Sequence, residues 1–360
     1  MGKIGIVGFH NLHLMQFLYK YTEILDRYNV EYDVLYWNRD GVSYKKRFNG
    51  TAICFEYLTS NYCSKLQKVE GFLKCRDFFI KTIKKNKYDK LILLTTQTSI
   101  ALFDIVLSKY KGNYIFDYRD ITGEKNHLYL TLVKQLIRCS YTTAISSPGF
   151  VRILGDSKKY MISHNCCLLS CDQLSENKHD DSVIKITFWG MIRQLDYQKR
   201  ICDLFGNDPR FELYYHGEGS GQQLKEYCVF RNYNNITFTG RYYPEQIKDF
   251  AEQTDILMNL YENEGKQEYA LTVKLYDGIR YGIPMLVSKG SFMESFIGNR
   301  QMAYYFSFSD TDKDNIVSWY KGLDKKVLRA EAEQIIEIIN RDERIFENKL
   351  LEFAFEGENQ

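Results

Sequence analysis

Two charged side chains in the segment QEYALTVKLYDGIRYGIPMLVS (267–288) are the first place where this sequence could do chemistry. Lys274 and Asp277 stand in a stretch that predicts a helix, which Gly282 ends and a buried strand follows. Residues three apart lie on one face of a helix. A lysine is a point charge for an anion such as phosphate. The open question is whether this face meets solvent or a ligand.

The loops after the predicted strands in the second half of the chain hold further candidates. Parallel α/β sheets bind ligands at the carboxyl ends of their strands. Glycines stand just past several of these strands, where the missing Cβ lets a ligand approach the backbone. They are Gly190, Gly217, Gly219 and Gly240. Each one alone is also an ordinary turn glycine. Together with Arg193 and Lys274, they predict a cleft for a phosphorylated ligand.

The elements that would position these residues alternate between strand and helix. In the first half, strands are predicted at 3–9, 31–37, 90–96, 113–118, 142–146 and 160–164. Helices are predicted at 14–28, over a long stretch ending at Asn86, at 98–110 and at 127–139. In the second half, strands are predicted at 184–190, 211–217, 235–240, 255–261 and 284–288, and 312–354 is charged and helical throughout. This alternation predicts an α/β fold with parallel strands and crossover helices.

The composition predicts two domains in a reducing compartment. A chain of 360 residues exceeds the size at which one core usually stops growing. The nine cysteines are scattered and MGKIGIVGF is no secretory signal, so a cytoplasmic protein is expected. The cluster CCLLSC (166–171) lacks the paired spacing of a metal site. The most apolar segment, 91–107, is short and interrupted by Gln97 and Asp104, so no transmembrane helix is predicted.

The charge is distributed unevenly. Residues 1–170 hold 25 Lys and Arg against 14 Asp and Glu, whereas the remainder holds 23 against 32. Much of the excess lies in 45–90, with 12 basic and 4 acidic residues interleaved with Phe72, Phe78 and Phe79. This stretch is either a surface that binds an anionic membrane or an ordinary helix, with its basic residues in solvent and its phenylalanines packed in the core. Nucleic acid is not expected as a partner, because the second half is acidic and no binding motif is present.

The first predicted strand carries no dinucleotide fingerprint. The loop GFHNLH has a turn glycine, Gly8, but not G-x-G-x-x-G, which argues against an oxidoreductase. His10 and His13 stand at the start of the following predicted helix. They either touch a substrate or are turn and cap residues.

The order of the loops in the second half resembles a known family. The succession strand-G-x-x-R, strand-H-G-x-G, strand-x-G-R-Y and then KLYDGIRYGIP (274–284) is similar to the C-terminal domain of bacterial family 4-type glycosyltransferases, especially capsule and exopolysaccharide enzymes. The resemblance covers essentially the whole chain and is strong over 186–290. It implies the glycosyltransferase-B fold, with two Rossmann-like domains that face each other across a cleft.

This resemblance implies a domain plan. Residues 1–170 would form an N-terminal acceptor-binding domain, 171–182 a linker, and 183–335 a C-terminal domain for the nucleotide-sugar. Residues 336–360 would form a C-terminal helix that packs back on the N-terminal domain.

The resemblance also implies roles for the residues at the strand ends. In that family a basic pair clamps the donor diphosphate, and an acidic residue one turn along the helix binds the ribose hydroxyls. By position, Arg193 and Lys274 would be the clamp and Asp277 the ribose ligand. The remaining expected donor contacts are Gly190, His216, Gly217, Gly219, Arg241, Tyr242 and Leu275. Fixed cations and a helix N-terminus lower the barrier as charge grows on the leaving diphosphate, and they can replace a metal ion.

The sequence departs from the family pattern at two places. The family has two Glu eight residues apart, but the residue eight before Asp277 is Tyr269. Glu268, one position earlier, is the expected contact of the donor sugar, with Glu262 and Glu264 as alternatives. The loop FDYRDITGEKNH (116–127) stands where a catalytic histidine is usual in the family. Arg119, Asp120 and His127 are candidates there, and a local ion pair is the alternative for the first two.

The resemblance thus implies a retaining, metal-independent hexosyltransferase with no cofactor. It would move a sugar from a UDP- or GDP-linked donor to a glycan or polyprenyl-diphosphate-linked acceptor in surface polysaccharide synthesis, in the cytoplasm at the inner face of the plasma membrane. The residues expected at the reacting centre are Arg193, Lys274, Glu268, His127 and Asp120. The alternatives are a sugar-nucleotide 2-epimerase on the same fold and a non-catalytic scaffold that binds a glycan or a partner.

Overall fold

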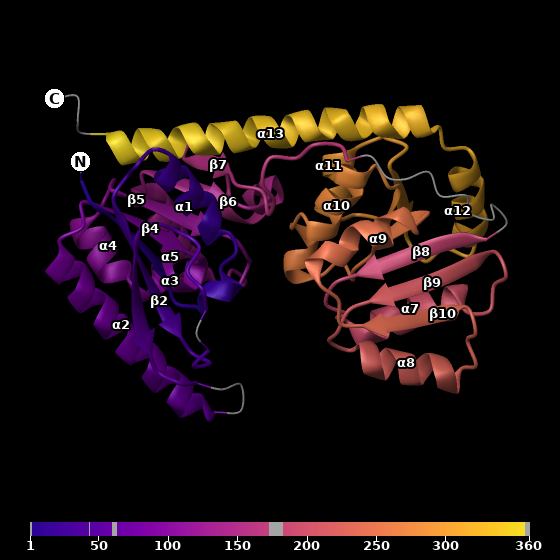
Figure 1. Ribbon diagram of the computed structural model, residues 1–360, viewed down its shortest axis with the longest axis horizontal. Helices are drawn as coiled ribbons and strands as arrows, with labels where there is room; N and C mark the ends of the chain where they lie inside the picture. The colour runs from indigo at the N-terminus through magenta and orange to yellow at the C-terminus, as the bar shows by residue number, and fades with distance from the viewer. Residues whose placement is uncertain (1, 43, 60–62, 173–182, 357–360) are drawn as a thin grey trace. The chain divides into compact units, whose positions relative to one another are not determined.

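The computed structural model describes residues 2–42, 44–59, 63–172 and 183–356 (Figure 1). The chain divides into two compact units. The first unit consists of Met1–Cys167 with Arg341–Gln360, and the second of Leu168–Asn340. Each unit is a parallel sheet packed between helices, so the predicted α/β fold is confirmed. Of the predicted linker 171–182, residues 173–182 lie outside the described part of the chain.

The sheet of the first unit has, within the described residues, the strand order β3-β2-β1-β4-β5-β6-β7. The strands are β1 (Ile4–Gly8), β2 (Tyr32–Asn38), β3 (Thr51–Glu56), β4 (Lys90–Leu94), β5 (Tyr114–Tyr118), β6 (Thr142–Ile145) and β7 (Tyr160–Ile162). All neighbours are parallel, with Ile6 beside Val34 on one side and Ile92 on the other. The carboxyl ends of β1, β4 and β5 therefore meet at one edge of the sheet.

Helices cover both faces of this first sheet. Ile115 of β5 belongs to the core under α1 (Leu18–Arg27) and the end of α13. Tyr114, its neighbour along the strand, donates a hydrogen bond to the Leu136 carbonyl of α5 (His127–Cys139). Because successive residues of a strand point to opposite faces, α5 lies on the other side. The remaining helices of this unit are α2 (Lys65–Asn86), α3 (Thr96–Ala101), α4 (Phe103–Lys109) and α6 (Val151–Leu154).

The sheet of the second unit has, within the described residues, the order β10-β9-β8-β11-β12-β13. The strands are β8 (Ile184–Trp189), β9 (Phe211–His216), β10 (Ile236–Gly240), β11 (Ile256–Asn259), β12 (Met285–Ser288) and β13 (Ala303–Phe306). They too are parallel throughout. The loops that carry the predicted donor site thus leave the same edge of one sheet.

Helices also cover both faces of this second sheet. Phe188 of β8 packs in the core under α7 (Leu195–Phe205), α8 (Gly221–Phe230) and α12 (Asp312–Lys321). Trp189, its neighbour along β8, contacts α10 (Val273–Tyr281), so α10 lies on the other face. α9 (Ile247–Glu252) precedes β11, and α11 (Phe292–Ile297) packs against β12 and β13.

The last helix, α13 (Lys325–Phe355), contributes to both units. Residues 336–355 of the predicted helix 336–360 form its later part, and 357–360 lie outside the described part of the chain. In the second unit, Glu331 accepts hydrogen bonds from the backbone N–H groups of Gln301 and Met302. In the first unit, the Glu343 carboxylate pairs with the buried ammonium of Lys20 at 2.7 Å. The Lys90 ammonium donates to backbone carbonyls at the carboxyl end of the helix, where a cation is favourable.

The predicted elements differ from the observed ones in a few places. Two strands were not predicted, β3 and β13. The predicted helix 14–28 begins only at Leu18, because a 3-10 turn, η1 (Leu12–Leu14), comes first. The predicted helix 98–110 is two helices that meet at Leu102. The segment 312–354 is not helical throughout, since α12 ends before Gly322 and α13 starts at Lys325.

Among the helices of the described residues, none combines the length and the apolar character needed to cross a bilayer.

Candidate active site

The strand-end loops of the second unit are joined through their backbones. The Gly190 N–H donates to the His216 carbonyl at 2.9 Å, and the Gly217 N–H donates to the Gly240 carbonyl at 2.7 Å. Gly217 has a φ of 148°, and a Cβ there would lie 1.8 Å from the Gly190 carbonyl oxygen. At Gly219, with a φ of 93°, a Cβ would lie 2.4 Å from the Ile192 carbonyl oxygen. A side chain at either position would collide with the neighbouring loop. Gly217 and Gly219 are therefore required by the contact between the loops and not only by the turns in which they stand.

Lys274 is a buried ammonium that forms no ion pair with a described carboxylate. Its side chain is only 6 % exposed, and its Nζ lies 4.1 Å from the ring centroid of Phe188 and 4.9 Å from that of Tyr261. Among the described residues, no carboxylate is within ion-pairing distance of it. A Cβ built on Gly190 would be 3.5 Å from the same Nζ, so the ammonium stands beside that loop. A buried cation of this kind is costly unless an anion joins it.

The helix that carries Lys274 is anchored at its first turn. Thr272 is the N-cap of α10, and its hydroxyl oxygen accepts a hydrogen bond from the Leu275 N–H at 3.3 Å. The same hydroxyl donates to the buried side chain of Asn259 at 2.8 Å. Lys274 is thereby fixed in the first turn of a helix, where the free N–H groups and the helix dipole also favour an anion. Leu275 itself is buried, so its side chain packs in the core.

Asp277 lies further along the same helix and is mostly buried. Its Oδ2 accepts a hydrogen bond from the indole Nε1 of Trp189 at 2.8 Å. Burial raises the pKa of this carboxyl group above its ordinary value, while the Trp189 hydrogen bond and the charges of Lys274 and Arg280 act in the opposite direction. The carboxylate also affects Tyr242, whose pKa is raised first by burial and further by Asp277 and Tyr261. The loop after β10 therefore comes close to α10.

Arg193 is exposed just after the loop of Gly190, at the same sheet edge as Lys274. The next residue, Gln194, exchanges hydrogen bonds with the backbone of Glu262, donating at 3.4 Å and accepting at 3.0 Å. This pair ties the loop after β8 to the loop after β11. Of the two sequence-predicted cations, Lys274 is thus buried in α10 and Arg193 is exposed on the loop after β8.

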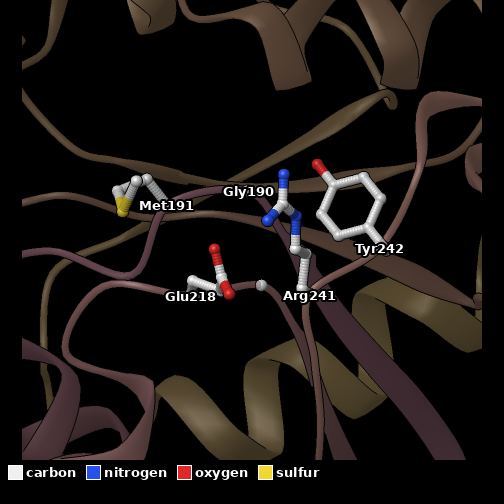
Figure 2. Close-up of a pocket in the computed structure, with 6 residues that line it drawn as sticks. Gly190, Met191, Glu218, Arg241 and Tyr242 are labelled. Carbon is white, nitrogen blue, oxygen red and sulfur yellow. The ribbon is translucent and has the colours of Figure 1, made fainter. Parts of the chain in front are cut away.

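A shallow pocket of about 190 Å³ opens between the loops after β8, β9 and β10 (Figure 2). It is lined by Gly190, Met191, Gly217, Glu218, Arg241 and Tyr242. Figure 2 shows the Glu218 carboxylate between Met191 and the Arg241 guanidinium, with the Tyr242 ring on the far side of Arg241. The pocket offers a cation, an anion and an aromatic face to one ligand.

His216 supports this pocket and does not line it. The imidazole is buried and stacks on Phe250 with 3.7 Å between ring centroids. Its Nδ1 is 2.8 Å from the Thr239 hydroxyl. Burial lowers the pKa of His216 to about 4, so the ring is neutral at neutral pH. Phe250 in turn makes an edge contact with Tyr242, at 5.5 Å between ring centroids.

The acidic candidates before α10 stand in the same loop as Lys274. Glu268 ends the 3-10 turn η4 (Gly265–Glu268) and is half-buried. Glu262 and Glu264 are exposed, and the Glu264 N–H donates to the Glu262 carbonyl at 2.8 Å. None of these contacts distinguishes one of the three as a sugar ligand, so Glu268 stays a prediction.

The candidates of the first unit follow β5. Asp120 is exposed in the loop, and His127 is exposed at the first position of α5, whose N-cap is Asn126. Arg119 is buried, and its Nε lies 2.6 Å from Asp117 Oδ1. The ion-pair alternative therefore holds for Arg119, with Asp117 as the partner. Asp120 and His127 stay predictions.

His10 and His13 also lie at the carboxyl edge of the first sheet, in the loop after β1 and in η1 rather than at the start of α1. His13 stacks on Tyr44 with 4.3 Å between ring centroids, and its Nδ1 is 4.0 Å from Asp40 Oδ2. Burial and the charge of Arg39 lower the pKa of His10.

Several site residues were not found from the sequence. Met191 and Glu218 line the pocket, and Trp189, Thr272 and Asn259 hold α10 in place. Glu218 stands between two loop glycines, which is a signal that could have found it. Thr272 carries the signal of a threonine N-cap, whereas Trp189 and Asn259 carry none, because their partners are 88 and 13 positions away in the sequence. Among the described residues, no cluster of His, Cys, Asp or Glu could hold a metal ion.

Comparison with known proteins bears on the fold. No protein-family model and no curated protein matches the sequence. Among solved structures, a sucrose-phosphate synthase from Thermosynechococcus elongatus matches with a TM-score of 0.74 at 11% identity, over 98% of this chain and 99% of that one. The lipopolysaccharide outer core galactosyltransferase WaaB matches with 0.68 at 12% identity, over 97% and 99%. Anabaena HepE, in complex with UDP and glucose, matches with 0.64 at 12% identity, over 97% and 99%.

Identities this low carry information about architecture only. The similarity nevertheless extends over both units of this chain and over almost the whole length of each of those proteins. This chain therefore has the α/β fold of the glycosyltransferase-B enzymes.

Proposed function

We propose that this protein is a glycosyltransferase that uses a UDP- or GDP-linked sugar as donor. The observation that carries the proposal is Lys274, a buried ammonium without a described acidic partner, in the first turn of a helix and beside Gly190. A diphosphate would supply the missing negative charge. The similar folds add support, because HepE was solved with UDP and an E. coli protein of this fold with UDP-2-fluoro glucose.

In this proposal the cations act on the leaving group. The bond between the anomeric carbon and the diphosphate oxygen breaks, and negative charge grows on the diphosphate as it leaves. Lys274 and the free N–H groups of α10 stand ready to stabilise that charge without reorganisation. Arg193, exposed on the neighbouring loop, would close its planar fork on the same phosphates. With cations in these places, transfer would proceed without a metal ion.

The rest of the donor would extend from the diphosphate along the loops. Asp277 would accept hydrogen bonds from the ribose hydroxyls, and the pocket of Glu218, Arg241 and Tyr242 would hold the base. Glu268 would contact the donor sugar, a hexose that keeps its anomeric configuration.

The acceptor would use the first unit, with Asp120 or His127 taking the proton of its hydroxyl. We propose a glycan or a polyprenyl-diphosphate-linked acceptor of a surface polysaccharide, met at the inner face of the plasma membrane. The phenylalanines of the basic stretch do not support membrane contact, because Phe72 and Phe79 pack on Phe9 at 5.1 and 5.0 Å between ring centroids.

A different stripe on α2 supports contact with a membrane. Leu66, Val69 and Leu73 repeat at helical spacing and are all exposed, Leu66 by 82 %. Lys65 and Lys68 flank them, so the stripe combines apolar and basic side chains as an anionic lipid surface requires.

Replacing Leu66, Val69 and Leu73 by Ser tests this surface by co-sedimentation with anionic liposomes. We expect the triple variant to lose most of its binding, while a matched change of the exposed Val229 and Phe230 on α8 leaves it intact. Equal binding of liposomes by both variants would show that the stripe is not the membrane-binding surface.

Nucleotide release from sugar donors tests the reaction itself. Incubation with UDP-glucose and with GDP-mannose should give slow release of UDP or GDP, and an acceptor should accelerate it. A change of the sugar without release would favour the 2-epimerase, and binding without any turnover would favour the scaffold.

A further inference from the structure

A hydrogen bond between Trp189 at the end of β8 and Asp277 on α10 has no role in the donor site as proposed so far. Trp189 is the last residue of β8 and is only 2 % exposed. Its indole Nε1 donates to Asp277 Oδ2 at 2.8 Å. An indole N–H is a donor only, so it orients whichever oxygen accepts from it.

This hydrogen bond leaves half of the carboxylate for another partner. A carboxylate has two oxygens with about four acceptor sites, and Trp189 occupies one side of it. Among the described residues, no hydrogen bond to Asp277 Oδ1 is observed, and this oxygen is not one of the buried polar atoms sealed from solvent. A single free oxygen in a fixed orientation suits a ligand with adjacent O–H donors, such as the two hydroxyls of a ribose.

The end of β8 also lies close to the ammonium of Lys274. Gly190 follows Trp189 and stands beside the Lys274 ammonium, while Trp189 itself reaches Asp277 one turn further along α10. Consecutive residues at the end of β8 therefore lie beside Lys274 and Asp277. A shift of Trp189 would move the phosphate side and the ribose side of the site together.

We propose that Trp189 is a positioning residue, which turns Asp277 so that its Oδ1 receives the ribose hydroxyls of a nucleotide. This inference rests on the proposed function, because it takes the ligand to be a nucleoside diphosphate. Trp189 acts through Asp277 and does not itself touch the ligand.

The charges around Asp277 set the expected pH dependence. Its pKa is raised by burial and lowered by the Trp189 hydrogen bond. The charged and titratable groups that face the carboxylate are Lys274, Arg280 and Tyr281 on α10 and Tyr242 after β10. Loss of the indole N–H removes one of the effects that favour the charged form. The carboxylate would then take up its proton at a higher pH, and ligand binding that needs the anion would fail sooner on acidification.

The test compares UDP with 2′-deoxy-UDP in titration calorimetry, with GDP and 2′-deoxy-GDP as the second pair, from neutral to mildly acidic pH. Trp189→Phe keeps the ring and removes the donor. We expect it to weaken ribonucleotide binding by about tenfold, as for loss of one hydrogen bond to a charged group, and to weaken 2′-deoxynucleotide binding much less. Its loss of binding should also begin at a higher pH than in the unchanged protein.

Two controls separate this role from a structural one. Trp37→Phe removes an equally buried indole donor, bonded to the Tyr57 carbonyl at 2.9 Å in the first unit, and should change neither affinity nor pH profile. Asp277→Asn keeps an acceptor for Trp189 without the charge and should remove the contribution of Asp277 to the pH profile, which leaves only the titration of the nucleotide's own terminal phosphate, with a pKa of about 6. If Trp189→Phe does not fold, the indole N–H resonances of the unchanged protein, which has three Trp, give the answer. UDP should shift the Trp189 signal more than 2′-deoxy-UDP does.

The outcomes distinguish the two proposals. Equal weakening of ribo- and deoxynucleotides by Trp189→Phe with an unchanged pH profile, or equal shifts of the Trp189 resonance, would overturn the positioning role and leave the proposed function intact. If the unchanged protein binds none of the four nucleotides, both proposals fail.

Discussion

At the scale of single residues, Lys274 lowers the stability of the folded protein but provides a charge that the proposed ligand needs. Its ammonium is buried between two aromatic rings without a described acidic partner. An uncompensated buried charge costs folding free energy, and proteins keep such costs where a ligand needs them.

Lys274→Met should therefore stabilise the ligand-free protein. Methionine fills a similar volume without the charge, and we expect the free energy of unfolding to rise by about 1 kcal/mol or more. Denaturant unfolding without nucleotide measures this change. A decrease in stability would mean that the contacts with Phe188 and Tyr261 outweigh the cost of burying the ammonium.

His216 gives a second prediction at this scale. The unfolded chain takes up a proton on this imidazole near its ordinary pKa of 6.5, whereas the folded protein does so only near 4. Between these values the unfolded state holds more protons, so stability falls as the pH decreases through this window. His216→Phe keeps the stacking on Phe250 and should flatten the decline by up to about 1.4 kcal/mol per pH unit. Thermal unfolding across the window checks this, and an unchanged slope would contradict it.

At the scale of elements, the first turn of α10 is the part on which the site depends. Thr272 caps the helix and is bonded to Asn259 at the end of β11, so the position of Lys274 is tied to the sheet.

Thr272→Val removes this anchor while keeping the shape of the side chain. We expect a loss of about 1 kcal/mol of stability together with weaker nucleotide binding. Ser64→Ala is the matched control, because Ser64 caps α2 in the first unit. It should cost similar stability and leave nucleotide affinity unchanged. If both variants bind nucleotide as well as the unchanged protein does, the anchor has no role in the site.

At the scale of the whole molecule, the alternation of strands and helices was enough to predict the α/β fold. The elements that were missed have weak patterns. β3 is an edge strand without a fully buried residue, and β13 is a four-residue strand at the other sheet's edge. Each contains an apolar run of only four residues, AICF in β3 and AYYF in β13, and periodicity alone does not identify so short a run as a strand.

The site was predictable only where its chemistry lies in local motifs. The glycine loops, Arg193 and Lys274 occupy one sheet edge, as parallel strands require. The Trp189 contact joins residues 88 positions apart, and the burial of His216 depends on Phe250 of another element. Such pairings arise from tertiary packing, and no spacing in the sequence encodes them.

The most direct test of the account is the affinity for UDP and GDP of the unchanged protein and of Lys274→Ala, measured by titration calorimetry. Lys225→Ala, which removes an exposed lysine on α8, is the control. Loss of a charged hydrogen bond to phosphate is worth roughly 1.5 to 3 kcal/mol, so we expect Lys274→Ala to bind at least tenfold more weakly and Lys225→Ala to bind normally. An affinity of Lys274→Ala within about threefold of the unchanged protein would contradict a diphosphate site at Lys274.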